Sequence, residues 1–194
     1  MGRVVAIEHL SLDGVMQGPA RPDEDQRDNF EYGGWALERN DPAMQAAMGA
    51  RMGTSWSLLA GRITYEDLMG AWAKPTQPNP FSDALNRIEK FVVSTTLREP
   101  LSWQNSTLLK GDPSAAVARL KKESDKTFVI FGSGMLVQSL MRQHLVDEFL
   151  LMIHPIVLGG GLRLFPHGVS HTTLRLSEAT MTQTGVIIAS YCER

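Results

Sequence analysis

Residues 57–68 read SLLAGRITYEDL and residues 128–140 read FVIFGSGMLVQSL, and these two stretches decide the fold. Each starts with a short apolar run typical of a buried strand, reaches a glycine, and continues as a sequence with helical spacing. A strand that leads directly into a helix is the unit from which parallel sheets are built. The two stretches therefore predict an α/β protein.

The rest of the chain continues this alternation. We expect strands at 4–10, 55–60, 91–94, 107–109 and 127–131, and helices at 43–52, 62–69, 82–88, from 113 onward and at 135–142. Asp41 before Pro42 and Asp112 before Pro113 are typical helix starts, and Ser82 is the expected cap of a third helix. A long apolar run covers 147–158, and two late strands joined at Gly185 indicate an antiparallel hairpin.

These elements predict one domain over residues 1–194: a mostly parallel central sheet, helices on both faces, and an antiparallel C-terminal strand or hairpin. Residues 19–41 are polar and punctuated by proline and glycine, so we expect a long irregular segment there. Segments of that length inside a compact domain are functional lids or disordered loops.

Composition excludes several classes of protein. The net charge is −2 with acids and bases interspersed, which argues against a nucleic-acid partner. Cys192 is the single cysteine, so neither an internal disulfide nor a cysteine metal cluster can form. The histidines lack metal-ligand spacing, and we expect no metal. No run of eighteen apolar residues and no signal-peptide pattern occurs, so we expect a soluble cytoplasmic protein without a membrane partner.

The two strand–glycine–helix stretches are suited to an anionic ligand. A helix N-terminus presents unpaired amides and about half a positive charge, and glycine lets the backbone approach a phosphate. Arg62 adds a planar cation and Thr64 a hydroxyl, so the bends at 61 and 132–134 are expected to hold a diphosphate jointly. Either bend taken alone is equally consistent with an ordinary helix cap.

A third strand end, FVVSTTL at 91–97, places hydroxyls beside Arg98 and suits a ribose phosphate, or else simply runs into a turn. The Rossmann fingerprint is absent because Val137 replaces its third glycine, and the GxxxxGK[ST] phosphate loop is missing as well. A dinucleotide would therefore be held in another way, and an ATPase is disfavoured.

The ordered set SLDGVM, GGWA, LLAGRITYEDL, NRIEKFVVSTTL, VIFGSGMLVQSLM, LVDEFLLMIHPIVLGGGLRLF and GVIIASY resembles the dihydrofolate-reductase-like superfamily over nearly the whole chain. It is most similar to the branch containing the C-terminal reductase domain of the bifunctional riboflavin-biosynthesis protein, and within it to small stand-alone bacterial relatives. The resemblance implies that the protein binds NADPH and reduces a small heterocycle. The preference for NADPH over NADH rests on this resemblance and on residues 94–98.

The resemblance also assigns site residues. The cofactor-binding positions that it implies are Gly61, Arg62, Thr64, Ser94, Thr95, Gly132, Ser133, Gly134, Met135 and Leu136. On the substrate side it implies the loop with Asp13 and Gly14 and the glycine-rich segment with Gly160 and Phe165.

Hydride transfer also needs a proton donor close to the acceptor. Asp13 is our candidate catalytic residue, with a turn-forming aspartate as the alternative. Asp41 and His154 are further substrate-side candidates, although Asp41 also suits a helix cap and His154 a core histidine or a wall of the substrate site.

The leading hypothesis is an NADPH-dependent reductase of the 5-amino-6-(5-phosphoribosylamino)uracil reductase type, as in riboflavin biosynthesis. A strict dihydrofolate reductase is an alternative, weakened because residues 43–52 contain no acid that could bind a pterin. A non-catalytic nucleotide-binding protein is the other alternative. Relatives of this kind pair, and the apolar runs at 149–158 and 186–189 exceed one core, so we expect a homodimer.

Overall fold

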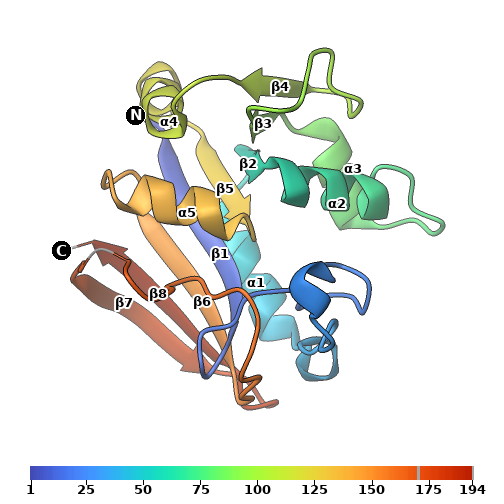
Figure 1. The fold of residues 1–194 in the computed structure, drawn as a ribbon, viewed down its shortest axis with the longest axis vertical. Helices are drawn as coiled ribbons and strands as arrows, with labels where there is room; N and C mark the ends of the chain where they lie inside the picture. The colour runs from blue at the N-terminus through green and yellow to red at the C-terminus, as the bar shows by residue number, and fades with distance from the viewer. Residues whose placement is uncertain (170, 194) are drawn as a thin grey trace.

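One sheet organises the protein, in a computed structural model that describes residues 1–169 and 171–193 (Figure 1). Within these residues, eight strands follow the order β4-β3-β2-β5-β1-β6-β8-β7. Their bounds are β1 (Arg3–Ser11), β2 (Trp56–Gly61), β3 (Lys90–Val93), β4 (Ser106–Leu109), β5 (Thr127–Phe131), β6 (Glu148–His154), β7 (Leu174–Met181) and β8 (Ile187–Glu193).

The pairing of the strands confirms the expected architecture. All neighbours from β4 to β6 pair in parallel, whereas β8 is antiparallel to both β6 and β7. The central strands are buried along most of their length, as parallel strands covered on both faces must be. Gly185 adopts φ +81° in the β7–β8 turn, which confirms the predicted hairpin.

Helices cover both faces of the sheet (Figure 1). The helices are α1 (Pro42–Met52), α2 (Arg62–Trp72), α3 (Pro80–Arg87), α4 (Pro113–Glu123) and α5 (Gly134–Met141). One apolar cluster joins α4 and α5 to Val4 and Ala6 of β1, and a second joins α1, α2 and α3 to Val5 and Ile7. Because successive residues of a strand point to opposite faces, the two clusters lie on opposite sides of the sheet.

Two predicted helix boundaries were wrong. The helix expected at 82–88 begins at Pro80, and Asn79 rather than Ser82 caps it, accepting from the amides of Phe81 at 2.9 Å and Ser82 at 3.2 Å. Asn79–Pro80 thus repeats the helix start predicted correctly at Asp41–Pro42. The helix expected at 62–69 continues to Trp72, because no helix-breaking residue stands before Pro75.

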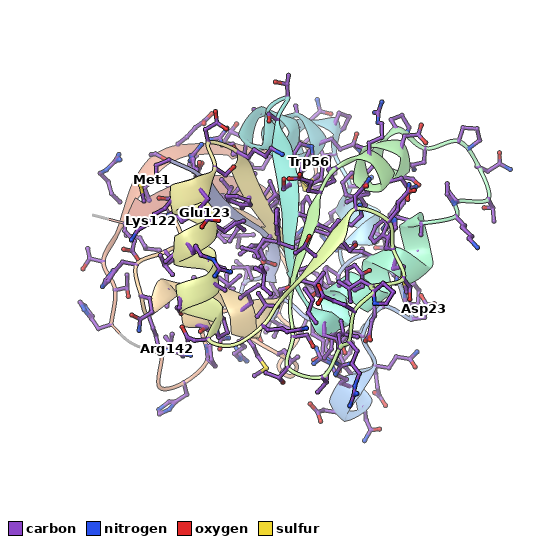
Figure 2. All side chains as sticks on the ribbon, turned by 90° about the horizontal axis from the view of Figure 1, so that it is seen from above. Met1, Asp23, Trp56, Lys122, Glu123 and Arg142 are labelled. Carbon is purple, nitrogen blue, oxygen red and sulfur yellow. The ribbon has the colours of Figure 1, made fainter. Side chains whose placement is uncertain are left out.

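The irregular segment 19–41 contains two short 3-10 turns, Arg27–Asn29 and Leu37–Arg39, and is tied to the fold. Trp35 is buried, and its indole nitrogen donates to the carbonyl of Gln17 at 2.7 Å. Arg21 forms an ion pair with Asp67 of α2. The segment therefore packs between the end of β1 and α2, on the side of the molecule where Figure 2 places Asp23.

At the opposite end of the strands, the first residues of the chain pack against the end of α4. The amide of Gly2 donates to the carbonyl of Lys121 at 2.7 Å, and Figure 2 shows Met1 beside Lys122 and Glu123 at the end of α4. Side chains fill the space between the sheet and the helices on both faces in that view. Within the described residues, no helix has the length and apolar character needed to cross a membrane.

Candidate functional site

The strand order places a switch point between β2 and β5. From β2 the chain passes through α2 to β3 on one face, and from β5 it passes through α5 to β6 on the other. The two strands are adjacent and parallel, so both helices start at the same edge of the sheet (Figure 1). Ligands of open α/β sheets bind at this kind of position, beyond the carboxyl ends of the strands.

The two glycine bends lie side by side at this switch point and are bonded to each other. The amide of Gly61 donates to the hydroxyl of Ser133 at 3.0 Å, and the amide of Ser133 donates to the hydroxyl of Thr64 at 3.0 Å. We expected the bends to be close but their groups to be free for a ligand. Instead, two hydroxyls lie between the bends and use two of the backbone amides.

The crossed hydrogen bonds still leave donors at the edge. Each hydroxyl accepts from an amide and keeps its own O–H for another acceptor. Helix geometry gives the amides that begin α2 and α5 no acceptor one turn back, although the amide of Leu136 already donates to the Ser133 carbonyl at 2.8 Å. The donors that remain for a phosphate are thus the hydroxyls of Thr64 and Ser133 and the amides that begin the two helices.

The backbone of the second bend is unusual. Gly132 and Ser133 both adopt left-handed conformations, with φ of +57° and +52°. A Cβ on Gly132 would lie 3.4 Å from the Thr64 hydroxyl oxygen, so this glycine lets the bends approach one another. Left-handed non-glycine residues such as Ser133 cost conformational energy and gather at functional sites.

Several exposed apolar side chains lie at the carboxyl ends of the parallel strands or in the helix turns that follow them. Met135, in the first turn of α5, is 82% exposed, whereas Leu136 beside it is buried in the core. Leu12 after β1, Ile63 in the first turn of α2 and Val157 after β6 are exposed as well. Exposed apolar groups mark binding surfaces where they form a contiguous patch, and sequence reasoning did not single out the last three.

The other predicted cofactor residues flank these bends. Arg62 is half-exposed and pairs with Glu66 at 2.8 Å, one helical turn along, in the kind of surface pair that contributes little to stability. Ser94 follows β3, and its hydroxyl accepts from the amides of Thr96 and Leu97, both at 3.1 Å, while Thr95 beside it is exposed. All the predicted cofactor residues therefore follow adjacent parallel strands at one edge.

Asp13 anchors a loop. Its carboxylate accepts from the Ser11 hydroxyl at 2.7 Å, from the amides of Leu158 and Gly159 at 3.1 and 2.9 Å, and from Arg163 at 3.2 Å. The Ser11 hydrogen bond, with those from the two amides, lowers the pKa of Asp13 to about 2. A carboxylate held in this way stays ionised near neutrality, which suits an anchor for residues 158–163 better than a proton donor.

Three other substrate-side candidates have structural contacts. Asp41 caps α1, accepting from the amide of Ala43 at 2.8 Å, and also accepts from the amide of Gln183 at 3.2 Å. Gly14 has φ +80° in the turn after β1. The ring of Phe165 packs edge-on against Phe149, with centroids 6.1 Å apart.

His154 belongs to a buried pair on the α1 face. Its Nε2 lies 2.9 Å from Nδ1 of His9, and the ring of Trp35 stacks edge-on against it at 5.2 Å. Burial lowers the pKa of both histidines to about 4, with smaller effects from His154 on His9 and from Arg39 on His154. Both rings are therefore neutral near pH 7, and Nδ1 of His154 has no partner among the described residues.

Sequence reasoning missed Glu8. This β1 residue is 2% exposed on the α5 face, and its Oε1 has no hydrogen-bond partner in the part of the chain that the structure describes. Burial raises the pKa of Glu8 well above its usual range, the amide of Gly132 opposes this, and Glu24 adds to it. Burial raises the pKa of Glu24 too. The sequence signal that could have identified Glu8 is a charged residue within an otherwise mostly apolar strand.

A cavity of about 370 Å³ is connected to the second bend through Met16, whose sulfur a Cβ on Gly134 would approach to 2.6 Å and whose amide donates to the carbonyl of Leu162 at the cavity wall. It lies between residues 27–32 and the glycine-rich loop at 160–162, above Gln17. Gly160 lines it, whereas Gly14, Asp41, His154 and Phe165 are not among its described lining residues. No group of three or more histidine, cysteine, aspartate or glutamate side chains suited to a metal occurs in the described chain.

The sequence of residues 4–188 matches the family of RibD C-terminal domains. The chain belongs to this family. Two Bacillus subtilis relatives, both described only as uncharacterized, are YwjB, 30% identical over 62% of this chain and 64% of its own length, and YyaP, 29% identical over 70% and 72%. The chain thus spans less than two thirds of YwjB.

Solved structures share the fold of this RibD C-terminal domain. A Shewanella sp. PV-4 protein, described as a candidate riboflavin biosynthesis protein, superposes with a TM-score of 0.73 at 20% identity over 99% of both chains. A pyrimidine reductase-like protein from Corynebacterium diphtheriae gives 0.67 at 12%, covering 99% of this chain and 92% of its own. Enterococcus faecalis dihydrofolate reductase complexed with NADP(H) gives 0.63 at 13%, covering 99% and 96%.

Proposed function

We propose that this protein is an NADPH-dependent reductase of a small heterocyclic substrate, with the cofactor's diphosphate held at the bends at 61 and 132–134. The observation that carries this proposal is that both glycine bends and both helix starts meet at the switch point, where the crossed hydrogen bonds hold them together although they occupy the amides of Gly61 and Ser133. Membership of a reductase-type family and the NADP(H)-bound dihydrofolate reductase of similar fold support it.

The residues at the edge fit a dinucleotide. When bound, NADPH supplies a hydride to an acceptor beside it. The Thr64 and Ser133 hydroxyls and the amides that begin α2 and α5 would bind its diphosphate, and Arg62 would exchange its exposed partner Glu66 for a phosphate. Ser94, Thr95 and Arg98 would face a ribose phosphate, which is why we propose NADPH over NADH.

A proton must accompany the hydride. The hydrogen bonds to Asp13 lower the pKa of its carboxyl to about 2, whereas burial raises the pKa of Glu8 well above its usual range. We therefore propose that Glu8, beneath the Gly132 bend and outside the cavity lining, supplies the proton through a water, and we give Asp13 the role of positioning the 158–163 loop.

The alternatives fit the contacts less well. A strict dihydrofolate reductase needs an acid facing its pterin, yet α1 contains none and Asp41 is engaged as its cap. A non-catalytic nucleotide-binding protein would have the same bends, but it would not need a buried carboxyl group such as that of Glu8 next to them.

Cofactor binding and turnover test the proposal. Fluorescence titration should give saturable NADPH binding with a micromolar Kd, and incubation with pterins, pyrimidines and quinones should consume NADPH with at least one of them. Binding without consumption across the panel would favour the non-catalytic alternative. Absence of binding would overturn the proposal, and methotrexate-sensitive reduction of dihydrofolate would favour the strict dihydrofolate reductase.

We also propose that residues 1–194 form one cytoplasmic domain that pairs as a homodimer. β7 is an edge strand whose residues are nearly all exposed, and Leu176, Met181 and Ile187 add exposed apolar surface there. Unprotected edges of this kind favour pairing with another strand. Light scattering after size exclusion should give twice the monomer mass, and a monomer would remove this part of the proposal.

A further inference from the structure

The cavity between residues 27–32 and 160–162 has the size and the walls of a site for a small flat molecule. Its volume of about 370 Å³ falls in the range of small-molecule pockets. Phe30 and Tyr32 line one side, with ring centroids 5.8 Å apart, and Tyr32 is 51% exposed. Aromatic side chains presented in this way stack on planar rings.

The glycine-rich loop at 160–162 forms the other wall of the cavity. A Cβ at Gly160 would meet no atom within 4 Å, so this residue leaves open space beside the cavity. A Cβ at Gly161 would lie 2.7 Å from Phe30 and 2.8 Å from Val15, so the aromatic wall is packed directly onto the loop. Gln17 joins the two walls, because its side chain donates to the carbonyl of Arg27 at 3.0 Å and accepts from the amide of Leu162 at 2.9 Å.

The charges around the cavity are unfavourable for an anion. Asp28 and Glu31 line it, and neither has an ion-pair partner among the described residues. Arg27 also lines it, but its guanidinium is held by both oxygens of Asp25, at 2.8 and 2.5 Å. The described lining therefore contains two carboxylates without an ion-pair partner, whereas its arginine is already paired with Asp25.

The neighbouring arginines are occupied as well. Arg163, next to the glycine loop, pairs with Asp13 at 3.2 Å, and Arg21 pairs with Asp67. Guanidinium groups suit bidentate phosphate recognition, but a phosphate that used these arginines would first have to displace the carboxylates paired with them. Like charges placed close together also disfavour a wrong partner.

We infer that this cavity is the acceptor site of the reductase and that it selects a planar, unphosphorylated heteroaromatic ring, neutral or cationic, whose amino groups donate to Asp28 and Glu31. The inference rests on the proposed function, which it narrows: it disfavours the phosphorylated pyrimidine expected at the family level. The exposed ring of Tyr32 would stack on the ligand ring, Phe30 would contact it edge-on, because the two aromatic planes lie 78° apart, and the two carboxylates would set the charge preference.

Two matched ligand pairs test this selection by calorimetric titration of the full chain. 6-Hydroxymethylpterin and pterin-6-carboxylate differ by one charge at similar size, and pyridoxamine and its 5′-phosphate differ by the phosphate. We expect the uncharged or cationic member of each pair to bind at least tenfold more tightly. The double variant Asp28→Asn/Glu31→Gln should reduce both affinity ratios severalfold, because it removes the two negative charges of the cavity lining. Asparagine is chosen at residue 28 because it tolerates the left-handed backbone there.

The control is Asp125→Asn, which removes one exposed carboxylate just before β5, at the other edge of the sheet, and should leave both ratios unchanged. Equal or tighter binding of the anionic members, ratios unaffected by the double variant, or no binding of any of the four ligands would overturn the inference. NADPH is titrated in parallel. If NADPH binds but the expected charge preference is not seen, only this inference is rejected. If NADPH does not bind, the proposed function is rejected.

Discussion

The hydroxyl of Thr64 accepts the amide hydrogen of Ser133 at 3.0 Å, and this bond ties the first turn of α2 to the bend before α5. The two residues come from helices on opposite faces of the sheet. Together with the bond from Gly61 to Ser133, it fixes the distance between two helix N-termini that would otherwise be set only by packing. A preformed spacing of this kind lowers the cost of ordering a diphosphate site.

Thr64→Val should separate the two bends chemically while keeping the shape of the side chain. The amide of Ser133 would lose its acceptor, which should lower the free energy of unfolding by about 1 kcal/mol. NADPH binding should weaken by roughly tenfold, the loss expected for one phosphate-facing hydrogen bond of about 1.4 kcal/mol. Thr107→Val on the exposed face of β4 is the control, and equal NADPH affinity in both variants would argue against this role of Thr64.

Substitution by alanine should change the free energy of unfolding at only one of two adjacent glycines. Gly161 has φ +115° and faces Phe30 and Val15, so Gly161→Ala should destabilise the fold by roughly 1–3 kcal/mol through strain and overpacking. Gly160→Ala should leave the free energy of unfolding within about 0.5 kcal/mol, since its Cβ meets open space. Urea denaturation of both variants measures the difference, and similar losses would contradict the packing described for this loop.

The buried histidine pair should make the fold acid-sensitive. Because the pKa of His9 and of His154 falls to about 4 in the folded state, the unfolded chain binds more protons than the folded one below about pH 6.5. The free energy of unfolding should therefore drop as pH falls from about 6.5 to 4, by up to about 3 kcal/mol for one histidine. Denaturation of His154→Phe across this range should show a shallower slope, and exposed His167→Gln should show the wild-type slope.

Glu8 should have the opposite pH dependence. Burial raises its pKa in the folded state, so the unfolded chain loses its proton first as pH rises, and the fold is progressively weakened above the ordinary glutamate pKa. Glu8→Gln should therefore be more stable than the wild type at pH 8, with the difference shrinking towards pH 4. The same variant should keep its NADPH affinity and lose most of its turnover. Unchanged turnover would remove Glu8 as the proton donor.

The sheet could be predicted from the sequence because its signals are local. Apolar runs that end in glycine, and the Asp–Pro pairs at two helix starts, each specify an element without reference to the rest of the chain. Asn79–Pro80 follows the same rule and was overlooked, since the neighbouring prolines indicated a loop. The meeting of the proposed cofactor residues could be predicted for a related reason, because the carboxyl ends of parallel strands lie at one side of the sheet.

The substrate side depends on contacts that sequence spacing does not reveal. Gln17 meets Leu162 across 145 positions, and Asp13 meets Gly159 across 146. The local pattern SLDG suggested a reactive aspartate, but the ring of donors around it is assembled by the fold. Similarly, the pair formed by His9 and His154 arises from the adjacency of β1 and β6.

The most direct test of the central claim is an amide chemical-shift titration of the full chain with NADPH. We expect saturable changes, largest at Gly61, Ser133, Gly134 and Met135, because these groups form the joined bends and the first turn of α5. Thr64→Val should reduce those changes at equal ligand concentration. Saturable changes confined to other surfaces, or no changes at the four amides, would contradict the assignment of this edge as the cofactor site.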